Sequence, residues 1–130
     1  MTIERVNPAG LSRPSGFSHA VIGHGSVIAL AGQTALDAAG RITATGVVAQ
    51  FEVALANLLT ALAAAGGRPG QLASLTVYVV DMDDYRRNSA ALGEVWRRLA
   101  GRDYPAMAAV GVTRLWDPGA LVEVQGMAII

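Results

Sequence analysis

His19 is the side chain best suited to moving a proton near neutral pH. It follows Phe17 by two residues, so in an extended strand both side chains project to the same face. An imidazole with an ordinary pKa of about 6.5 could act as a general acid or base. A surface or interface histidine is the simpler alternative. His24, the second histidine, lies in a glycine-flanked turn and is expected to be exposed.

Glu123 is the second candidate for acid–base chemistry. It lies in the segment Leu121–Gln125, where strand alternation puts Glu123 and Gln125 on the same face as Leu121. Two interpretations remain open. Glu123 is either an ordinary solvent-facing strand residue or a carboxylate that lines a pocket.

The composition excludes several classes of site and partner. The chain has no cysteine, which excludes disulfides, thiolate metal sites and a cysteine nucleophile, and its two histidines are too few for a histidine-rich metal centre. Ten basic and ten acidic residues are scattered and leave a net charge of zero, so no basic stripe for nucleic acid is present. The segment Met1–Arg5 lacks the pattern of a signal peptide, and no apolar run reaches the roughly 18 residues of a membrane span. We therefore expect a soluble cytoplasmic protein with no metal and no nucleic-acid or membrane partner.

The elements that must position these side chains follow from hydrophobic periodicity. A chain of 130 residues, 52% hydrophobic and 15% charged, suits one well-packed domain over residues 1–130. The predicted order is β-β-β-α-β-α-β-β, a two-layer α+β domain with both helices on one face of a mixed sheet. The predicted ranges are strands 3–7, 18–22, 27–31, 72–80, 107–113 and 120–129, a helix with an apolar stripe from Val48 to Leu62, and a second helix from about 84 to 100. Gly23–Ser26 is expected to close a hairpin between the second and third strands.

The sheet face away from the helices is not expected to remain bare. The strand at 107–113 and the residue before it carry small residues at Ala106, Ala108, Ala109 and Gly111, which would allow close approach of a second chain. A homo-oligomer is the economical prediction.

Short motifs in a fixed order carry a resemblance to a known family. They are Phe17–Val21, Ala31–Gln33, Gln50 with Asn57-Leu58, Ala65-Gly66, Val79–Met82 with Asn88, Pro105-Ala106, Arg114-Leu115 and Val122–Val124. Together they make the chain resemble the RidA family (YjgF/YER057c/UK114) over essentially its whole length. The resemblance implies a chorismate-mutase-like fold, a homotrimer with ligand pockets in the clefts between subunits, and no cofactor. It also implies hydrolysis of enamines and imines, released by pyridoxal-phosphate enzymes, to ketoacids and ammonia.

The same resemblance assigns roles to particular positions. In deaminating members an arginine stands at the position of Met107 and holds the substrate carboxylate, a task that suits its bidentate fork. A glutamate matching Glu123 helps to position water, and Gly32 has an N–H that could bind a ligand oxygen. Asn88 matches a recurrent asparagine, which implies a place on the substrate side or a hydrogen bond that fixes a neighbouring loop or subunit.

Three departures from the family pattern fall in the expected pocket. Arginine is replaced by Met107, a tyrosine by Phe17 and a serine by Ala31, and each change removes a polar group. Arg114 cannot replace the missing cation within one subunit, because seven strand residues span roughly 20 Å. We interpret the pocket as suited to apolar ligands or to ligands without a carboxylate. Met107 as simple core filling is the alternative.

Three functions are consistent with this pattern. The first is a RidA-like enzyme that hydrolyses, deaminates or tautomerises an enamine or imine with altered substrate preference. The second is a non-catalytic, trimeric ligand-binding or regulatory protein. The third is the ribonuclease activity sometimes attributed to the family. The neutral net charge and the absence of a basic patch or of two histidines placed to act as a catalytic pair argue against it.

Overall fold

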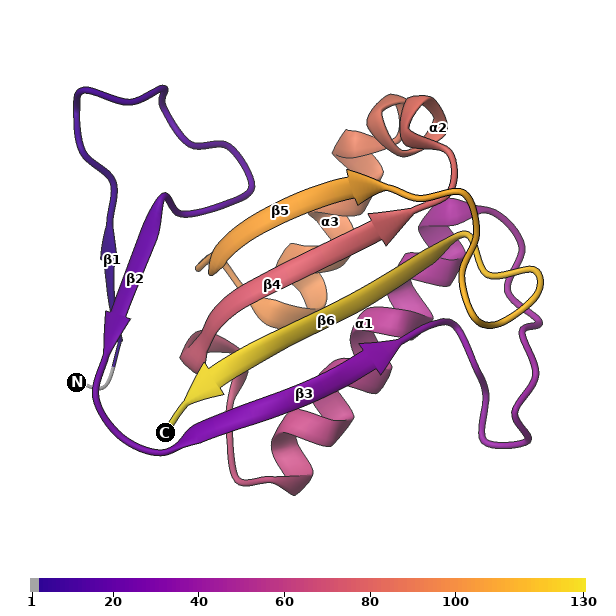
Figure 1. Ribbon diagram of the computed structural model, residues 1–130, viewed down its shortest axis with the longest axis horizontal. Coiled ribbons are helices and arrows are strands. Elements are labelled where there is room, and N and C mark those ends of the chain that lie inside the picture. Colours follow the sequence, from indigo (N-terminus) through magenta and orange to yellow (C-terminus); the bar gives the residue numbers. More distant parts are fainter. Residues whose placement is uncertain (1–2) are drawn as a thin grey trace.

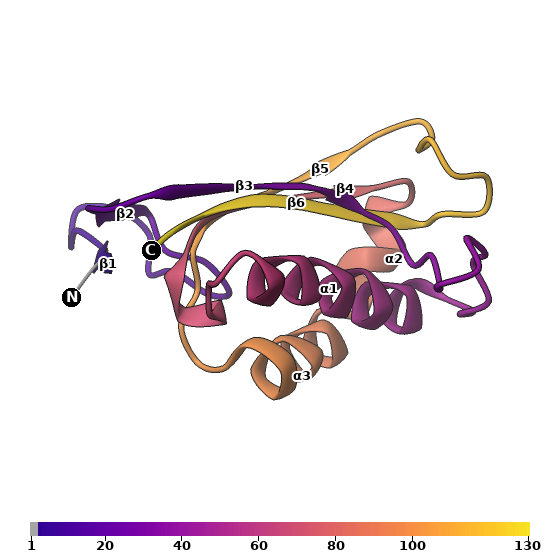
Figure 2. The same ribbon diagram turned by 90° about the horizontal axis from the view of Figure 1, so that it is seen from below.

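The computed structural model describes residues 3–130, which form two layers (Figure 1, Figure 2). The elements in chain order are β1 (Ile3–Val6), β2 (Ala20–Gly23), β3 (Val27–Gln33), α1 (Val47–Ala64), the 3-10 turn η1 (Pro69–Gln71), β4 (Leu72–Val79), α2 (Met82–Arg87), α3 (Ser89–Ala100), β5 (Ala106–Gly111) and β6 (Val122–Ile129). Four strands form a sheet in the order β3-β6-β4-β5, and α1 and α3 lie on one of its faces. β4 and β5 run parallel, while the other neighbouring pairs are antiparallel. The expected mixed-sheet α+β fold is confirmed.

The expected hairpin at Gly23–Ser26 is wrong. β2 begins at Ala20 rather than at Ser18, and it pairs with β1 in a separate two-stranded sheet. β3 pairs instead with β6, and the connection is held to the C-terminus by two backbone hydrogen bonds between Ser26 and Ile130, at 2.8 and 2.9 Å. The glycines therefore mark a passage from one sheet to another, which local turn chemistry does not distinguish from a hairpin.

The expected second helix is divided in two at Asn88. This residue has φ −100° and ψ 16°, outside the helical range, and its side-chain amide donates to the carbonyl of Asp84 at 2.8 Å. An asparagine that bonds to nearby backbone competes with helix continuation, and α3 begins after it at Ser89. The element order is thus β-β-β-α-β-α-α-β-β.

The core lies between the sheet and α1. The apolar stripe of α1 is buried against inward-facing sheet residues such as Val77, Val122 and Val124. With a mean hydropathy of 1.7 over its 18 residues, α1 is long and apolar enough to cross a membrane by length and composition alone, contrary to the expectation for the chain. Its packing is that of the core helix of a soluble fold, because Leu55 and Leu58 are fully buried by the sheet and by α3.

The sheet face away from the helices, which we call the open sheet face, carries exposed apolar side chains. Val27, Val110 and Met127 are 62%, 39% and 45% exposed in the single chain. Exposed apolar side chains spread over one face are a common feature of contact surfaces. A second chain on this face remains a prediction.

Candidate functional site

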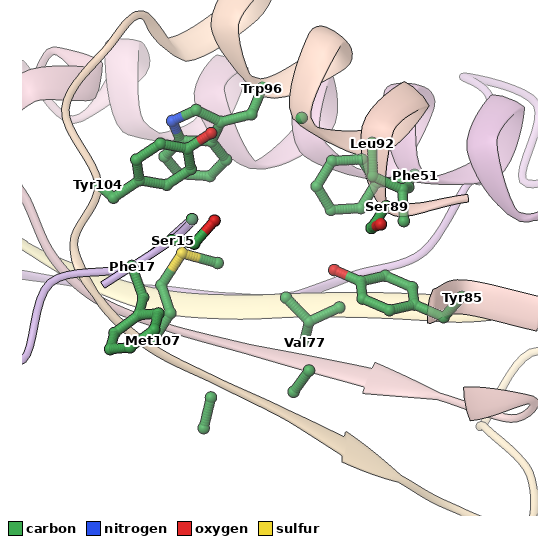
Figure 3. A pocket seen from close by; sticks show the side chains of 14 residues that line it. Ser15, Phe17, Phe51, Val77, Tyr85, Ser89, Leu92, Trp96, Tyr104 and Met107 are labelled. Carbon is green, nitrogen blue, oxygen red and sulfur yellow. The ribbon is translucent and has the colours of Figure 1, made fainter. Parts of the chain in front are cut away.

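A cavity of about 360 Å³ lies between the helices and the edge of the sheet at β5 (Figure 3). Met107 enters it from β5, where its partner in the parallel ladder is the buried Leu75 of β4, which faces the helices. Aromatic rings form much of the wall, and we call this space the aromatic cavity. They belong to Phe17, Phe51, Tyr85, Trp96 and Tyr104. Every residue that lines the cavity is uncharged at neutral pH, and the remaining polar side chains are serines.

Phe17 reaches the aromatic cavity because Ser18 fastens the N-terminal arm to the start of β5. The Ser18 N–H donates to the carbonyl of Pro105 at 2.9 Å, and its hydroxyl donates to the carbonyl of Tyr104 at 2.7 Å. Ser18 is itself buried. Figure 3 shows the result, with Phe17 and Met107 at the same end of the cavity.

Tyr85 enters from α2 on the other side. Asp81 caps this helix by accepting from the Asp84 N–H at 3.0 Å, and the Tyr85 N–H donates to the Asp81 carbonyl at 3.0 Å. The Tyr85 ring meets Phe51 edge to face, with centroids 6.5 Å apart. Burial raises the pKa of the Tyr85 phenol above its usual value, so the group is a neutral hydrogen-bond donor at physiological pH.

Trp96 and Tyr104 close the cavity at the α3 side. Their rings are stacked with centroids 5.1 Å apart and an interplanar angle of 14°. The indole Nε1–H donates to the carbonyl of Asp103 at 3.1 Å, which fixes the orientation of Trp96. The rings therefore form a flat, rigid wall suited to a planar ligand.

Glu123 lies on the open sheet face, beside a β-bulge. The pairing of β3 with β6 shifts between Leu30 and Gln33, which leaves Ala31 and Gly32 in the bulge. A Cβ placed on Gly32 would lie 3.0 Å from the Glu123 carboxyl carbon, so glycine leaves the space that the carboxylate occupies. Burial raises the pKa of the Glu123 carboxyl, and the charge of Asp117 raises it further.

Met107 and Glu123 lie on opposite faces of the sheet. Met107 pairs with Leu75 and Glu123 pairs with Tyr78, both on β4. Because side chains alternate along a strand, two positions three residues apart face opposite ways. One chain thus brings together Met107 and Phe17 in the aromatic cavity, and Gly32 and Glu123 on the open sheet face, but not the two pairs.

The arrangement has close counterparts among known proteins. The family model described as Endoribonuclease L-PSP matches residues 10–130. A Rid-family protein of unknown function from Yersinia pestis, YyfB, has the same fold over the full length of both chains, with 32% identity and a TM-score of 0.89. The chain belongs to the RidA family.

Other members of the RidA family are similar over most of their length. A RutC family protein of Pyrococcus horikoshii is 32% identical over 117 residues, which cover 89% of each sequence. The structure of RidA from an Antarctic Psychrobacter species matches all of this chain and 99% of its own, with 28% identity and a TM-score of 0.71. The similarity to these relatives therefore extends over most or all of the chain.

Two residues that the RidA resemblance or the strand pattern singled out lie outside the aromatic cavity. The Asn88 amide is occupied by Asp84, donating to its carbonyl and, at 3.2 Å, to its Oδ1. The His19 ring contacts Phe17 edge to face at 4.9 Å, so the two do share a face, and its Nε2 lies 2.7 Å from the Ser12 carbonyl. A carbonyl only accepts, so Nε2 carries a proton and Nδ1 remains for other partners. Their functional roles remain predictions.

Several residues that shape the site were not identified as such from the sequence. Buried Gln50 bonds to the carbonyl of Gly119 and to the N–H of Leu121, at 3.1 and 2.8 Å, and so fixes the start of β6. Asp117 accepts from the Thr34 hydroxyl at 2.6 Å. The family motif that contains Gln50 was the signal in the sequence for this residue. No pattern in the sequence around Asp117 indicated that it lies near Glu123.

Proposed function

We propose that the chain is a small-molecule enzyme that converts an enamine or imine lacking an α-carboxylate, most simply by hydrolysis. Family membership supports a small-molecule enzyme. The observation that carries the altered substrate is the aromatic cavity, which Met107 lines and in which every lining residue is uncharged. The family resemblance implies an arginine that holds the substrate carboxylate at the position of Met107. A carboxylate moved there would lose its hydration without gaining a cationic partner, which is costly.

The proposed site is completed by a second copy of the chain. Glu123 and the aromatic cavity lie on opposite faces of one sheet, so a ligand in the cavity can reach a Glu123 only from another subunit. The exposed apolar residues of the open sheet face support such contact. Trp116 supports it as well, since it is 93% exposed and is adjacent to Asp117, the residue whose charge acts on Glu123. The proposed assembly is the homotrimer implied by the family resemblance, and the proposed location is the cytoplasm.

The chemistry needs only water and proton transfer. The imine carbon would lie in the aromatic cavity, shaped by Met107 and Phe17. Glu123 of the partner copy would accept a hydrogen bond from the attacking water and take its proton. Return of that proton to the imine nitrogen gives the carbinolamine. A second transfer through Glu123, from the carbinolamine hydroxyl to nitrogen, accompanies cleavage of the C–N bond, so that ammonia and the carbonyl product leave and Glu123 is again a carboxylate. A carboxyl group whose pKa is raised toward neutrality is a better proton carrier for this sequence than an ordinary one.

The proposal is tested with imines generated in the reaction vessel. An amine oxidase acting on benzylamine supplies an uncharged imine, and an amino-acid oxidase supplies 2-iminobutyrate. Formation of the carbonyl product is followed with and without the protein. We expect acceleration for the uncharged imine, little for 2-iminobutyrate, and loss of the acceleration in Glu123→Gln. Glu94→Gln is the matched control, because Glu94 is exposed and paired with Arg97.

Binding without turnover would favour the alternative, a non-catalytic trimeric ligand-binding or regulatory protein. The uncharged imine then would bind, but product formation would match the spontaneous rate in every variant. RNA cleavage is not proposed despite the name of the family model, because the net charge is zero and the aromatic cavity has no cationic side chain.

A further inference from the structure

The aromatic cavity has few groups that can donate a hydrogen bond to a ligand. Ser15 and Ser89 are exposed, and the Trp96 Nε1–H is already used by the Asp103 carbonyl. The phenols of Tyr85 and Tyr104 remain. Within residues 3–130, Tyr78 is the one tyrosine whose hydroxyl has a partner in the chain, Gln125 at 2.9 Å. Both cavity phenols are therefore available to a ligand.

The two phenols differ in how they are presented. Tyr104 lies flat against Trp96, and its hydroxyl is beside the indole (Figure 3). The Tyr85 hydroxyl points into the open space of the cavity, across from Phe17 and Met107. A partly desolvated donor that has no partner gains more from a ligand acceptor than a donor that keeps its water.

We propose that Tyr85 is the specificity-determining hydrogen-bond donor of the aromatic cavity, and that its ligands are small, uncharged, ring-containing compounds with one acceptor atom. The acceptor would be the nitrogen of an imine or the oxygen of its carbonyl product, a choice that rests on the proposed function. The ring would lie between the Trp96–Tyr104 wall and Met107, with the acceptor directed at Tyr85.

Size and rigidity both suit this class of ligand. About 360 Å³ is near the lower end of the roughly 300–1,000 Å³ typical of small-molecule sites, so a single-ring compound is the natural occupant. Tyr85 is held in place because Asp81 caps α2 at one end and Asn88 bonds back to Asp84 at the other. A donor positioned in advance loses little freedom on binding. The raised pKa of the phenol keeps it protonated over the working pH range.

Binding is measured with acetophenone, an uncharged aromatic ketone, on protein labelled with ¹³C at its methionine methyl groups. Met107 lines the cavity and reports occupancy, while exposed Met127 on the open sheet face serves as an internal reference. We expect a saturable shift of the Met107 signal alone. Tyr85→Phe should weaken acetophenone binding about 3- to 10-fold, the usual worth of one neutral hydrogen bond. Ethylbenzene, which lacks the acceptor, should bind equally well to the wild type and to Tyr85→Phe.

Two matched variants decide the assignment. Tyr78→Phe removes a phenol outside the cavity and should leave acetophenone affinity within about 2-fold of the wild type. Tyr104→Phe removes the competing donor of the cavity wall and should weaken acetophenone binding less than Tyr85→Phe does. The assignment is overturned if Tyr85→Phe binds acetophenone like the wild type, or if Tyr104→Phe alone weakens binding. The absence of a saturable Met107 shift would overturn the ligand class itself. Binding that follows this pattern without any imine turnover would leave the inference standing and contradict only the proposed enzyme.

Discussion

Met107 on β5 and Glu123 on β6 each pair with a residue of β4, and these two β4 residues face opposite sides of the sheet. Met107 lies beside Leu75, on the side of the helices, and Glu123 lies beside Tyr78, on the open sheet face. The sheet thus separates the Met107 side chain from the Glu123 carboxylate within one chain. Chemistry that needs both groups requires two copies of the chain.

Met107→Arg should restore hydrolysis of 2-imino acids. The guanidinium would supply the bidentate carboxylate partner that the uncharged cavity lacks, and we expect kcat/KM for 2-iminobutyrate to rise at least about 10-fold. Met107→Lys, which adds the charge without the fork, should give a smaller increase. The measurement is oxidase-coupled ketoacid formation. An unchanged rate in a correctly folded Met107→Arg protein would show that Phe17 and Ala31 are also required.

Gly32→Ala should displace the Glu123 carboxylate while leaving Glu123 itself unchanged. The added methyl group would lie 3.0 Å from the carboxyl carbon and would push the carboxylate away from its position. We expect a loss of turnover on the order of 10- to 100-fold, the size associated with displacement of a catalytic group by about 1 Å. Gly70→Ala is the control, because that position opens onto free space. Full activity in Gly32→Ala would mean that the placement of Glu123 is not critical.

Asp117→Asn should lower the pKa of Glu123. The Asp117 charge is one of the two causes that raise this pKa, and an asparagine can still accept the hydrogen bond from Thr34. A ¹³C titration of the Glu123 carboxyl group should report a downward shift with no change of fold. A pKa that stays where it is would assign the whole effect to burial.

The raised pKa also fixes the sign of a stability effect. The folded chain binds the Glu123 proton more tightly than the unfolded chain does, so the contribution of Glu123 to stability falls as pH rises from its ordinary pKa through its raised pKa. Glu123→Gln removes this decline. The free energy of unfolding of Glu123→Gln minus that of the wild type, measured by urea titration, should increase with pH across that window and stay constant above it. A difference independent of pH would contradict the linkage.

Gln50→Leu should destabilise the fold more than an exposed substitution would. Buried Gln50 serves two carbonyls, of Ala44 and Gly119, and the N–H of Leu121. Leaving such groups without partners costs about 1–3 kcal/mol for each that water cannot reach. Thermal and urea unfolding measure the loss, with Arg13→Leu at an exposed position as control. A change in the free energy of unfolding below about 0.5 kcal/mol would show that the surrounding loops re-form their bonds.

The sequence predicted the layers of this fold better than the connections between its strands. The apolar stripe from Val48 to Leu62 predicted α1, and the run 72–80 predicted β4. Both patterns lie within one element, so they can be recognised from neighbouring residues alone. The partner of β2 and the break at Asn88 depend on contacts with distant segments, Ile3–Val6 in one case and the bond to Asp84 in the other. Local turn and helix signals carry no information about either.

In the candidate site, too, relations within one strand could be predicted from the sequence and relations between strands could not. Alternation placed Glu123 correctly relative to Gln125 and Phe17 relative to His19, since both pairs share a strand or a short extended segment. The relation between Met107 and Glu123 depends on the register of β5 and β6 against β4, which no pattern in a single strand can fix. Tyr85 falls within the predicted second helix, from about 84 to 100, and no local pattern distinguishes it there. Its role as a donor emerged only from the cavity around it.

Subunit complementation tests most directly whether the site is shared between two copies. Glu123→Gln chains and Ala109→Trp chains, in which a bulky ring fills the aromatic cavity, are expressed together with different tags and purified as mixed oligomers. Each variant alone should be inactive on the uncharged imine. In a random mixture about a quarter of the sites should combine an intact cavity with an intact Glu123, and activity should return to about that fraction. Mixed oligomers that are as inactive as either parent would contradict a site built from two chains.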